Sequence, residues 1–491
     1  MSSDQELEER RVCSDCVAEA FLAKLIDDEG DGADCDYCGA EGATISMSEL
    51  ADRTSKAISE HFYLTPDQPD AWDEMLMRDK ESNHEWYREG QPVLDLIEEI
   101  VGTRPEIAAD LREILDDREG FFDPSDPREE SPFATTAQYD SRGPNSDYWQ
   151  SEWDRLRRSL QSEARFFNQA AVTHLREIFG GVAAYRRGDS NPLIIAAGPG
   201  TAHPAFFRAR VFQNEKELLA ALKRPDLELG PPPEHAARAG RMNARGISVF
   251  YGSSNIETAM GEVRPPVGSH VLCGRFDVIR QLRLLNLKAL DTVTVSGSVF
   301  DPEYAHQRGW AQFLSILGKL MVRPVMPEAE HNDYLATQAI ADYLASSNEL
   351  QVDGILFPSV QRGADREDLN VVLFRKASTV EALPIPTGTK IDSRSGEDTE
   401  DGWEVGFSVI ESRPDPEVRA EGAATREVAN SRFDQDLMSF DDGNGLRSDH
   451  IETLRVCCES LHVHIVKAVR VEHEAHSVSR HIWYEGTATD F

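Results

Sequence analysis

The sequence predicts an α+β fold, in which a helical N-terminal domain precedes a central domain of mixed strands. Helical spacing of apolar residues dominates the first third of the 491 residues, as at 104–118, where Pro105 stands at a helix start. The centre carries short β-branched and aromatic segments bounded by Gly and Pro, such as 247–251 and 352–359. Two CxxC motifs near the N-terminus are the third observation, and they indicate a small fold held by a metal.

The N-terminal domain is expected to span residues 1–120 and to bind zinc. Its two CxxC pairs, with eighteen residues between them, form the arrangement that closes a tetrahedral thiolate site. The four cysteines are Cys13, Cys16, Cys35 and Cys38. Four protein ligands leave no open position for a substrate, so we expect a structural Zn2+. Chance spacing and a redox dithiol are the alternatives.

Composition excludes several classes of protein. The formal net charge of −36 argues against a general binder of nucleic acid or of anionic membranes, because such proteins need a basic face. The N-terminus lacks the apolar core of a signal peptide, and no apolar run of 18 residues occurs, so secretion and membrane spanning are not expected. Seven cysteines in an unsecreted chain favour metal binding or free thiols. We therefore expect a cytoplasmic protein.

Composition divides the rest of the chain into five segments. We expect a linker at 121–147, a connecting helix within 148–192, a central domain at 193–380, an acidic flexible region at 381–450 and a small β element at 451–491. The connecting helix is predicted to run unbroken over residues 148–179, because large apolar residues recur at helical spacing. The alternating pattern at 461–483 predicts a hairpin of two strands.

The segment 241–266 carries the residues around which the central domain is interpreted. A strand is predicted to end at Tyr251, and Ser253 or Ser254 is expected to cap the helix that follows. Two prolines end this helix, which places Glu262 in its last turn. A carboxylate there faces the unfavourable end of the helix dipole, so a solvated surface Glu is the alternative to a functional acid.

Other segments supply further charged and polar groups. Arg208 and Arg210 lie on one face of a predicted strand, and arginine pairs naturally with phosphate oxygens. Further along, one apolar strand ends at Ser359 and the next begins at Asn370. This set suits cleavage of an N-glycosidic bond in a phosphorylated nucleotide, since a fixed carboxylate stabilises the positive charge that builds on the ribose.

In this order, the segments from about residue 193 to residue 376 resemble the RES domain family, whose members are NAD-degrading toxins with a fold similar to that of ADP-ribosyltransferases. The resemblance implies NAD+ as the substrate, held by a local basic pocket in this acidic chain. By position, it makes Arg208 the phosphate-holding arginine, Tyr251 the residue that stacks on nicotinamide, and Glu262 the catalytic acid. Ser359 is then the hydroxyl that orients the nicotinamide end.

The resemblance also covers supporting residues. Arg241 matches the family's Arg-x-Asn block, in which Asn243 supports the loop, as Asn370 supports the last strand. Arg210 is a further candidate for NAD+ binding. The N-terminal domain resembles the zinc-bearing module that is found ahead of RES domains and of HEPN domains.

The resemblance implies an NAD+ glycohydrolase or phosphorylase of the toxin or defence-effector type, with an antitoxin or a sensor protein as partner. Two alternatives remain open. The first is an ADP-ribosyltransferase that acts on a macromolecule. The second is a zinc-dependent binding module whose RES domain is inactive. The sequence does not determine the oligomeric state.

Overall fold

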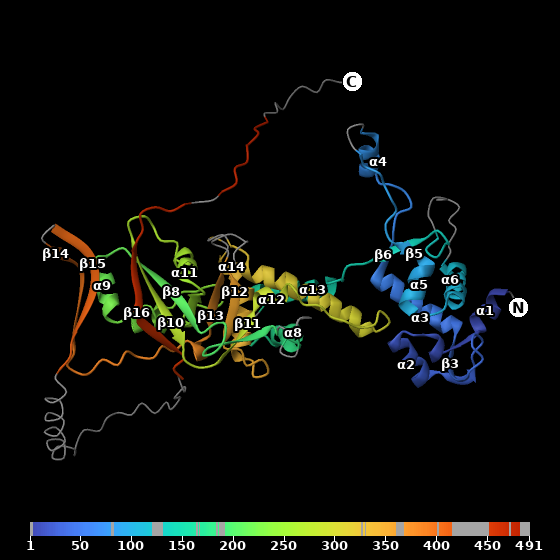
Figure 1. Cartoon of the computed structure of the whole chain (residues 1–491), viewed down its shortest axis with the longest axis horizontal. Coiled ribbons are helices and arrows are strands. Elements are labelled where there is room, and N and C mark those ends of the chain that lie inside the picture. Colours follow the sequence, from blue (N-terminus) through green and yellow to red (C-terminus); the bar gives the residue numbers. More distant parts are fainter. Residues whose placement is uncertain are drawn as a thin grey trace, which may run out of the picture. The chain divides into compact units, whose positions relative to one another are not determined.

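The computed structural model describes all residues except 1–2, 80–82, 120–130, 164, 166, 183–184, 186–191, 326–327, 329, 360–367, 400–401, 415–450, 471–472 and 482–491. Helices and strands are mixed, which confirms the predicted α+β class (Figure 1). The chain divides into two compact units. Unit 1 comprises Met1–Ile195 and Leu285–Leu350, and unit 2 comprises Ala196–Leu284 and Gln351–Phe491. The predicted central domain at 193–380 has residues in both units, and its bounds stay a prediction.

Unit 1 begins with a small sheet and several helices packed around the cysteines. The elements are α1 (Ser3–Glu9), β1 (Arg11–Cys13), α2 (Ala20–Glu29), β2 (Asp31–Asp34), β3 (Glu41–Ser46), α3 (Met47–His61), α5 (Val93–Val101) and α6 (Pro105–Glu119). Both β1 and β2 pair with β3 in antiparallel fashion. Helix α3 begins where Ser46 accepts a hydrogen bond from the Glu49 amide, at 3.2 Å. Pro105 opens α6, as predicted.

A second small sheet corrects the predicted linker at 121–147. Strand β6 (Gln138–Ser141) pairs with β4 (Phe62–Leu64) and with β5 (Gln91–Pro92). Ala137 and Tyr139 belong to the same buried core as the cysteines, and both are less than 7% exposed. Part of the predicted linker, 120–130, lies outside the described residues. The remainder belongs to the N-terminal module, because burial of two apolar side chains outweighs the polar composition around them.

The predicted unbroken helix over 148–179 is also wrong. The structure has two helices, α7 (Asp147–Ser162) and α8 (Gln169–Gly180). Phe167 lies between them with a left-handed φ of 61°. Asn168 then starts the second helix, since its side chain accepts a hydrogen bond from the Ala171 amide at 3.0 Å. Asn168 is a typical helix-capping residue, so the sequence did indicate a helix start there. The helical spacing of the apolar residues hid this break.

Aromatic packing explains why residues 285–350 join unit 1. This segment contains α12 (Leu287–Leu290), α13 (Pro302–Val322) and α14 (Glu330–Ser346). Trp149 of α7 stacks on Phe313 of α13, with ring centroids 6.2 Å apart. The indole of Trp310 donates a hydrogen bond to the Ile178 carbonyl at 2.8 Å. The predicted aromatic stripe of the connecting helix is thus core.

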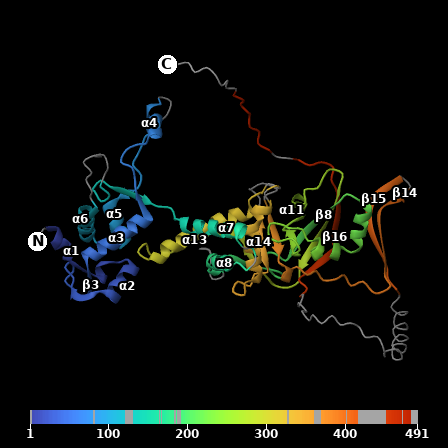
Figure 2. The ribbon, with the colours of Figure 1, turned by 180° about the vertical axis from the view of Figure 1, so that it is seen from behind.

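Unit 2 contains most of an eight-stranded sheet, whose last two strands, β11 and β7, also include residues assigned to unit 1 (Figure 1). In sheet order, the strands are β16 (Leu454–Ile465), β10 (His270–Val278), β8 (Ala205–Phe212), β9 (Phe250–Ser253), β13 (Leu369–Leu373), β12 (Gly354–Pro358), β11 (Leu282–Asn286) and β7 (Ile194–Ala197). Its helices are α9 (Glu215–Lys223), α10 (Pro225–Glu228) and α11 (Ile256–Glu262). Helix α11 lies beside β8 in both ribbon views (Figure 2), and it packs on that strand and on β10.

The C-terminal region joins this sheet, contrary to prediction. Strand β16 pairs along its length with β10, from Leu454 opposite Val278 to Ile465 opposite His270. Among the described residues beyond Ile465, up to His481, no strand forms, so the predicted hairpin at 461–483 is wrong over its described part. The predicted separate β element at 451–491 is instead an edge strand, because Leu454 is fully buried.

A hairpin occupies part of the region that was predicted to be acidic and flexible. Strands β14 (Lys390–Thr399) and β15 (Gly402–Ser412) pair in antiparallel fashion. The hydroxyl of Ser393 donates a hydrogen bond to the Leu219 carbonyl of α9, at 2.7 Å. The rest of the region, 415–450, lies outside the described residues.

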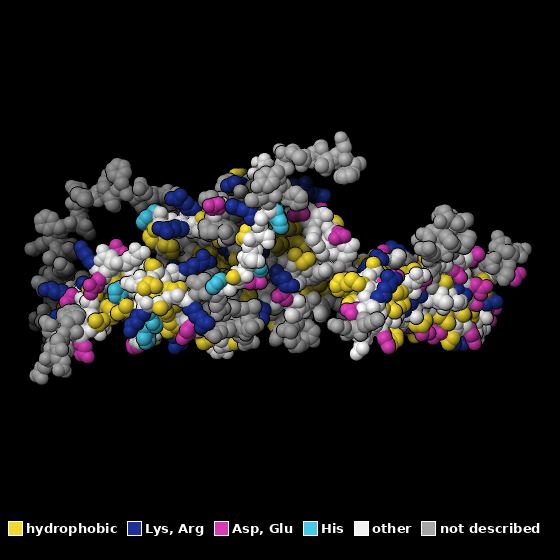
Figure 3. Space-filling view, turned by 90° about the horizontal axis from the view of Figure 1, so that it is seen from above, with side chains coloured by type: hydrophobic (Ala, Val, Ile, Leu, Met, Phe, Trp, Pro, Cys, Tyr) yellow, Lys and Arg dark blue, Asp and Glu magenta, His cyan; other side chains and the backbone are white. Residues whose placement is uncertain are grey.

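The surface carries both signs of charge. On the face that Figure 3 shows, Lys and Arg side chains are interspersed with Asp and Glu side chains. None of the described helices combines the length and the apolar character that a membrane crossing needs.

Candidate active site and metal centre

Helix α11 brings Glu262 to the sheet. The helix is capped by Asn255, whose side chain accepts a hydrogen bond from the Thr258 amide at 2.8 Å. The predicted cap, Ser253 or Ser254, is therefore wrong, because β9 runs over Phe250–Ser253 and includes Ser253. Ala259 packs the helix onto the sheet. Glu262 lies in the last turn, as predicted.

The carboxylate of Glu262 is held by two donors from neighbouring strands. Its Oε1 accepts a hydrogen bond from the Ser359 hydroxyl at 2.7 Å and another from the Asn370 side-chain amide at 2.7 Å. Both donors are buried, whereas Glu262 itself is exposed. Its Oε2 accepts no hydrogen bond from any residue that the structure describes. One oxygen is thus anchored to the sheet, and the other is free to meet a ligand.

Asn370 is oriented by Ser253, a residue that sequence reasoning missed as part of the site. The two residues are opposite each other in the pairing of β13 with β9. The Ser253 hydroxyl donates to Asn370 Oδ1 at 2.7 Å, which directs the amide NH2 toward Glu262. Ser253 follows Tyr251 by two residues on a strand, so its side chain shares a face with that of Tyr251. The alternation of side chains along the strand could have indicated that Ser253 lies on the same face as Tyr251. The interpretation of Ser253 as a helix cap hid this.

Tyr251 is fixed by the turn that contains the Arg-x-Asn block. Its hydroxyl donates to Asn243 Oδ1 at 2.9 Å and accepts a hydrogen bond from the Met242 amide at 3.1 Å. The Asn243 amide donates to the carbonyls of Arg238 and Ile247, at 2.9 and 3.0 Å. Asn243 therefore organises the loop.

Gly240 makes room for this arrangement. A Cβ atom there would lie 2.6 Å from Asn243 Oδ1 and 2.8 Å from the Tyr251 hydroxyl. Arg241 follows in the same turn and is partly exposed. The close approach ties the position of the tyrosine ring to a glycine.

Arg208 and Arg210 line a cavity of about 950 Å3. Arg210 is engaged there, since it donates to Glu228 Oε2 at 2.5 Å and to the Glu228 carbonyl at 2.9 Å. The guanidinium of Arg208 lies over the Phe250 ring, 5.1 Å from its centroid. Its Nη1 is buried, and no described residue accepts a hydrogen bond from it. An anionic ligand could supply the missing acceptor.

Burial changes the protonation of Arg208. Loss of solvation, with a smaller contribution from the nearby Arg210, lowers the pKa of Arg208 to about 10, while Tyr251 acts in the opposite direction. Arg208 and Tyr251 are therefore close enough to interact electrostatically. Arg208 remains a cation at neutral pH.

The strand register separates Arg208 from Glu262. Phe207 is opposite Ser253 in the pairing of β8 with β9, so Phe207 shares the face of the Glu262 network. Arg208, the next residue, points to the other face of β8. The cavity lining includes Arg208 and Arg210, but not Glu262. The structure thus brings together Glu262, Ser359 and Asn370, and it places Arg208 on the other face of β8.

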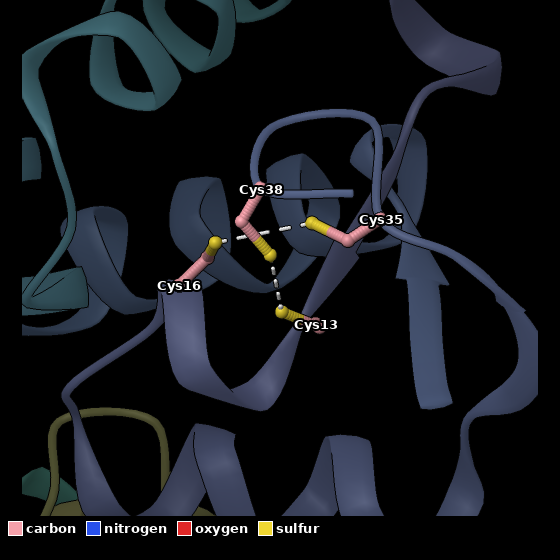
Figure 4. A group of neighbouring side chains, drawn as sticks. All are labelled: Cys13, Cys16, Cys35 and Cys38. Atoms are coloured by element: carbon pink, nitrogen blue, oxygen red, sulfur yellow. Dashed lines mark hydrogen bonds between the residues drawn. The ribbon is translucent and has the colours of Figure 1, made fainter. Parts of the chain in front are cut away.

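The metal centre has the geometry that its sequence predicted. All four cysteine Sγ atoms lie within 4.8 Å of one another. Cys13 and Cys38 are 3.5 Å apart and Cys16 and Cys35 are 3.8 Å apart, measured between Sγ atoms that point inward (Figure 4). Thiolates at a Zn–S distance of about 2.3 Å in a tetrahedron would be about 3.8 Å apart. The four cysteines fit a metal ion of this size.

Local structure explains the convergence. Cys13 ends β1, and a short 3-10 turn (Ser14–Cys16) carries the second ligand. The second pair lies on a turn closed by a hydrogen bond from the Gly39 amide to the Cys35 carbonyl at 2.8 Å. Burial raises the pKa of Cys16 to about 12, and the hydrogen bond that Arg104 donates to Cys16 Sγ at 3.0 Å acts in the opposite direction.

Comparison with known proteins gives one match. The family model described as the RES domain matches residues 210–394, which confirms the resemblance found in the sequence. The match contains Tyr251, Glu262, Ser359 and Asn370, and it begins two residues after Arg208. No curated protein and no solved structure matches the chain significantly. The resemblance of the N-terminal domain to a HEPN- or RES-associated module stays a prediction.

Proposed function

We propose that the protein cleaves the bond between nicotinamide and ribose in NAD+, because residues 210–394 match the RES domain. The family of this domain is toxin-like and NAD-related. The observation that carries the proposal is the Glu262 carboxylate, which two buried donors anchor through one oxygen while the residue itself stays exposed. In this reaction the C–N bond breaks, and nicotinamide leaves with the electron pair. Water or phosphate then supplies the oxygen that bonds to the ribose carbon.

Glu262 is proposed to act as the carboxylate that faces the ribose. As the C–N bond breaks, positive charge grows on the sugar, and a fixed negative group stabilises that charge more than it stabilises the ground state. Its free Oε2 can accept a hydrogen bond from a ribose hydroxyl. Ser359 and Asn370 hold the group in place, so little reorganisation is needed during the reaction.

The other predicted residues have proposed binding roles. Tyr251, with its hydroxyl tied to Asn243, offers a fixed ring for nicotinamide to stack on. Arg241, in the same turn, is proposed to hold the phosphates. Arg208 points to the other face of β8, so its buried Nη1 is proposed to bind an anionic group, such as phosphate, in the cavity that it lines. Arg210 is paired with Glu228, so we assign it to shaping the cavity around Arg208.

Zinc is proposed as the structural metal of the four cysteines, since a closed tetrahedral thiolate set is the usual environment of a structural Zn2+. The family resemblance adds an antitoxin or a sensor protein as a proposed partner.

The test is product analysis of NAD+ incubated with the purified protein, with and without phosphate. Hydrolysis gives nicotinamide and ADP-ribose, and phosphorolysis gives nicotinamide and a phosphorylated ADP-ribose. We expect Glu262→Gln to lower the rate by about 10²- to 10³-fold, because the amide keeps the shape and loses the charge. The matched control is Glu257→Gln on the exposed first turn of the same helix, which should leave the rate unchanged. Equal rates for wild type and Glu262→Gln would refute the proposal.

Two other functions are distinguished by the same material. If the label of radioactive NAD+ becomes attached to a macromolecule, the activity is ADP-ribosyl transfer. The separation of Arg208 from the Glu262 network favours the remaining candidate, a zinc-dependent binding module with an inactive RES domain. That candidate predicts that folded protein leaves NAD+ intact.

A further inference from the structure

Unit 1 contains a projecting segment that plays no part in the proposed NAD+ chemistry. Residues 65–90, which we name the acidic arm, leave the sheet after β4 and return at β5. The arm carries α4 (Ala71–Arg78), and Figure 1 shows this helix at the end of two extended segments, away from α3, α5 and α6. No side chain of α4 is buried. Residues 80–82 of the arm lie outside the described part.

The base of the arm is anchored firmly. The Arg88 guanidinium donates to the Thr65 carbonyl at 2.8 Å and to the Thr136 carbonyl at 2.9 Å, which joins the two ends of the arm to the module. Gly90 has a φ of 92°, and a Cβ atom there would lie 2.5 Å from the Tyr139 carbonyl oxygen. The point from which the arm projects is therefore set by close packing.

Helix α4 presents apolar side chains to solvent. Trp72 is 64% exposed and Met75 is 51% exposed. With Leu76, they occupy positions i, i+3 and i+4, so the three form one stripe. A helix of eight residues is too short to be stable in water by itself, and most helices gain their stability by packing an apolar face. The stripe of α4 has the composition of a face that packs against a partner.

Charge indicates what kind of partner this is. The arm contains eight acidic and three basic residues, a formal net charge of −5. Two of the basic residues are engaged, because Arg78 pairs with Glu74 at 2.9 Å and Arg88 holds the base. A second copy of this chain would bring two acidic arms together in a protein of net charge −36, which is unfavourable. The complementary surface is basic.

A cavity beside the helix has the same character. It measures about 480 Å3 and lies between the base of the arm and α4. Its charged lining is mainly acidic, because four acids outnumber one histidine and one arginine, whose guanidinium is bonded to the Thr65 and Thr136 carbonyls. The aromatic residues of the lining are Tyr63, Trp86 and Tyr87, the acids are Asp70, Asp73, Glu85 and Glu89, and the basic residues are His84 and Arg88. Aromatic faces next to carboxylates attract the cationic end of a Lys or Arg side chain.

We propose that α4 and the cavity beside it are the docking site for a basic amphipathic helix of another protein, which covers the Trp72–Met75–Leu76 stripe with its apolar face and inserts a Lys or Arg side chain into the cavity. In this mode an amphipathic helix packs its apolar face on an apolar surface of its partner. Aromatic and methionine side chains at the centre of such contacts supply most of the affinity.

The experiment uses the full-length protein and a synthetic amphipathic peptide of leucine and lysine as probe, with a leucine and glutamate peptide as the charge control. Fluorescence anisotropy measures the affinity, and light scattering measures the oligomeric state. The double variant Trp72→Ala with Met75→Ala should bind the lysine peptide at least about tenfold more weakly. Phe167→Ala, which removes an aromatic side chain that is 96% exposed elsewhere in unit 1, should bind like wild type.

Three results would overturn the proposal. The first is equal affinity of the double variant and the wild type for the lysine peptide, which would assign the binding to the overall negative charge. The second is equal binding of the two peptides by the wild type. The third is a wild-type dimer that the double variant converts to a monomer, which would make a second copy the occupant. Since both substituted residues are exposed, the variant should fold, and an unchanged unfolding midpoint checks this.

Discussion

At the scale of one residue, Arg208 is an example of a cation whose burial without a hydrogen-bond acceptor lowers the free energy of unfolding. Its guanidinium is partly withdrawn from water, and its Nη1 has no acceptor among the described residues. Placing a charged group in such a position without a hydrogen-bond partner is unfavourable. Residues with this property often belong to sites where a ligand completes the hydrogen bonding.

This leads to a prediction for Arg208→Met. The folded pKa of Arg208, about 10, lies below the ordinary value of an arginine, so the folded protein releases this proton before the unfolded chain does. The stability contribution of Arg208 therefore rises as the pH increases above about 10, and below that pH the charged side chain makes a net unfavourable contribution to folding. At neutral pH, the methionine variant should unfold at the same temperature as wild type or higher, while its affinity for inorganic phosphate falls.

Differential scanning calorimetry and phosphate binding by titration calorimetry check the two halves separately. Phe250→Ala is the matched control on the next strand, where loss of a fully buried ring should lower the free energy of unfolding by about 3–5 kcal/mol. A clear drop in the unfolding temperature of Arg208→Met would show that the guanidinium stabilises the fold.

At the scale of elements, strand β16 shows that the eight-stranded sheet extends beyond the residues that the RES family model matches. It begins 60 residues beyond the end of the family match, at Leu454 against residue 394, yet it pairs with β10 over most of its length. Its first residues, Leu454 and Val456, are buried, whereas His462 near its other end is exposed. The strand therefore contributes apolar contacts mainly where it begins.

Leu454→Ala should accordingly destabilise unit 2. Removing a fully buried leucine side chain typically lowers the free energy of unfolding by about 2–5 kcal/mol. Because β16 is paired into the eight-stranded sheet, the whole sheet should become less stable by this amount. Chemical denaturation followed by tryptophan fluorescence and far-ultraviolet circular dichroism measures it. His462→Ala on the same strand should change the free energy by less than about 0.5 kcal/mol. If Leu454→Ala were as stable as wild type, β16 would not be part of the cooperative sheet.

At the scale of the whole molecule, the candidate metal centre and the Glu262 network belong to different units. The cysteine cluster lies in unit 1, within the core that also contains Leu22, Ile97 and Leu111. The Glu262 network lies in unit 2. Metal removal should therefore act first on the N-terminal module.

We expect one zinc ion per chain in the purified protein, measured by elemental analysis. Cys16→Ser should reduce the zinc content and lower the unfolding temperature of the N-terminal module, since structural zinc contributes to the free energy of folding. Cys458→Ser, which alters an exposed cysteine of β16, is the control and should retain the metal. Full zinc occupancy in Cys16→Ser would contradict the assignment of that cysteine as a ligand.

The metal centre and the candidate active site differ in how far sequence alone could define them. All four cysteines converge as predicted, because each pair is brought together by a local turn. Glu262, Ser359 and Asn370 also meet, although about 100 residues separate Glu262 from the other two. Ser253 was missed, because its role depends on which strand lies beside β9.

The amino-acid sequence by itself determined the elements that depend on local chemistry. These are the thiolate cluster, the helix that ends at Glu262, and the ordered segments by which the RES domain was identified. Only the tertiary structure decided which faces these elements present and which distant strands they join. The pairing of β8 with β9 placed Arg208 on the other face of the sheet from the Glu262 network. The pairing of β16 with β10 brought β16 into the sheet. Register and burial arise from contacts between residues far apart along the chain, which no local pattern records.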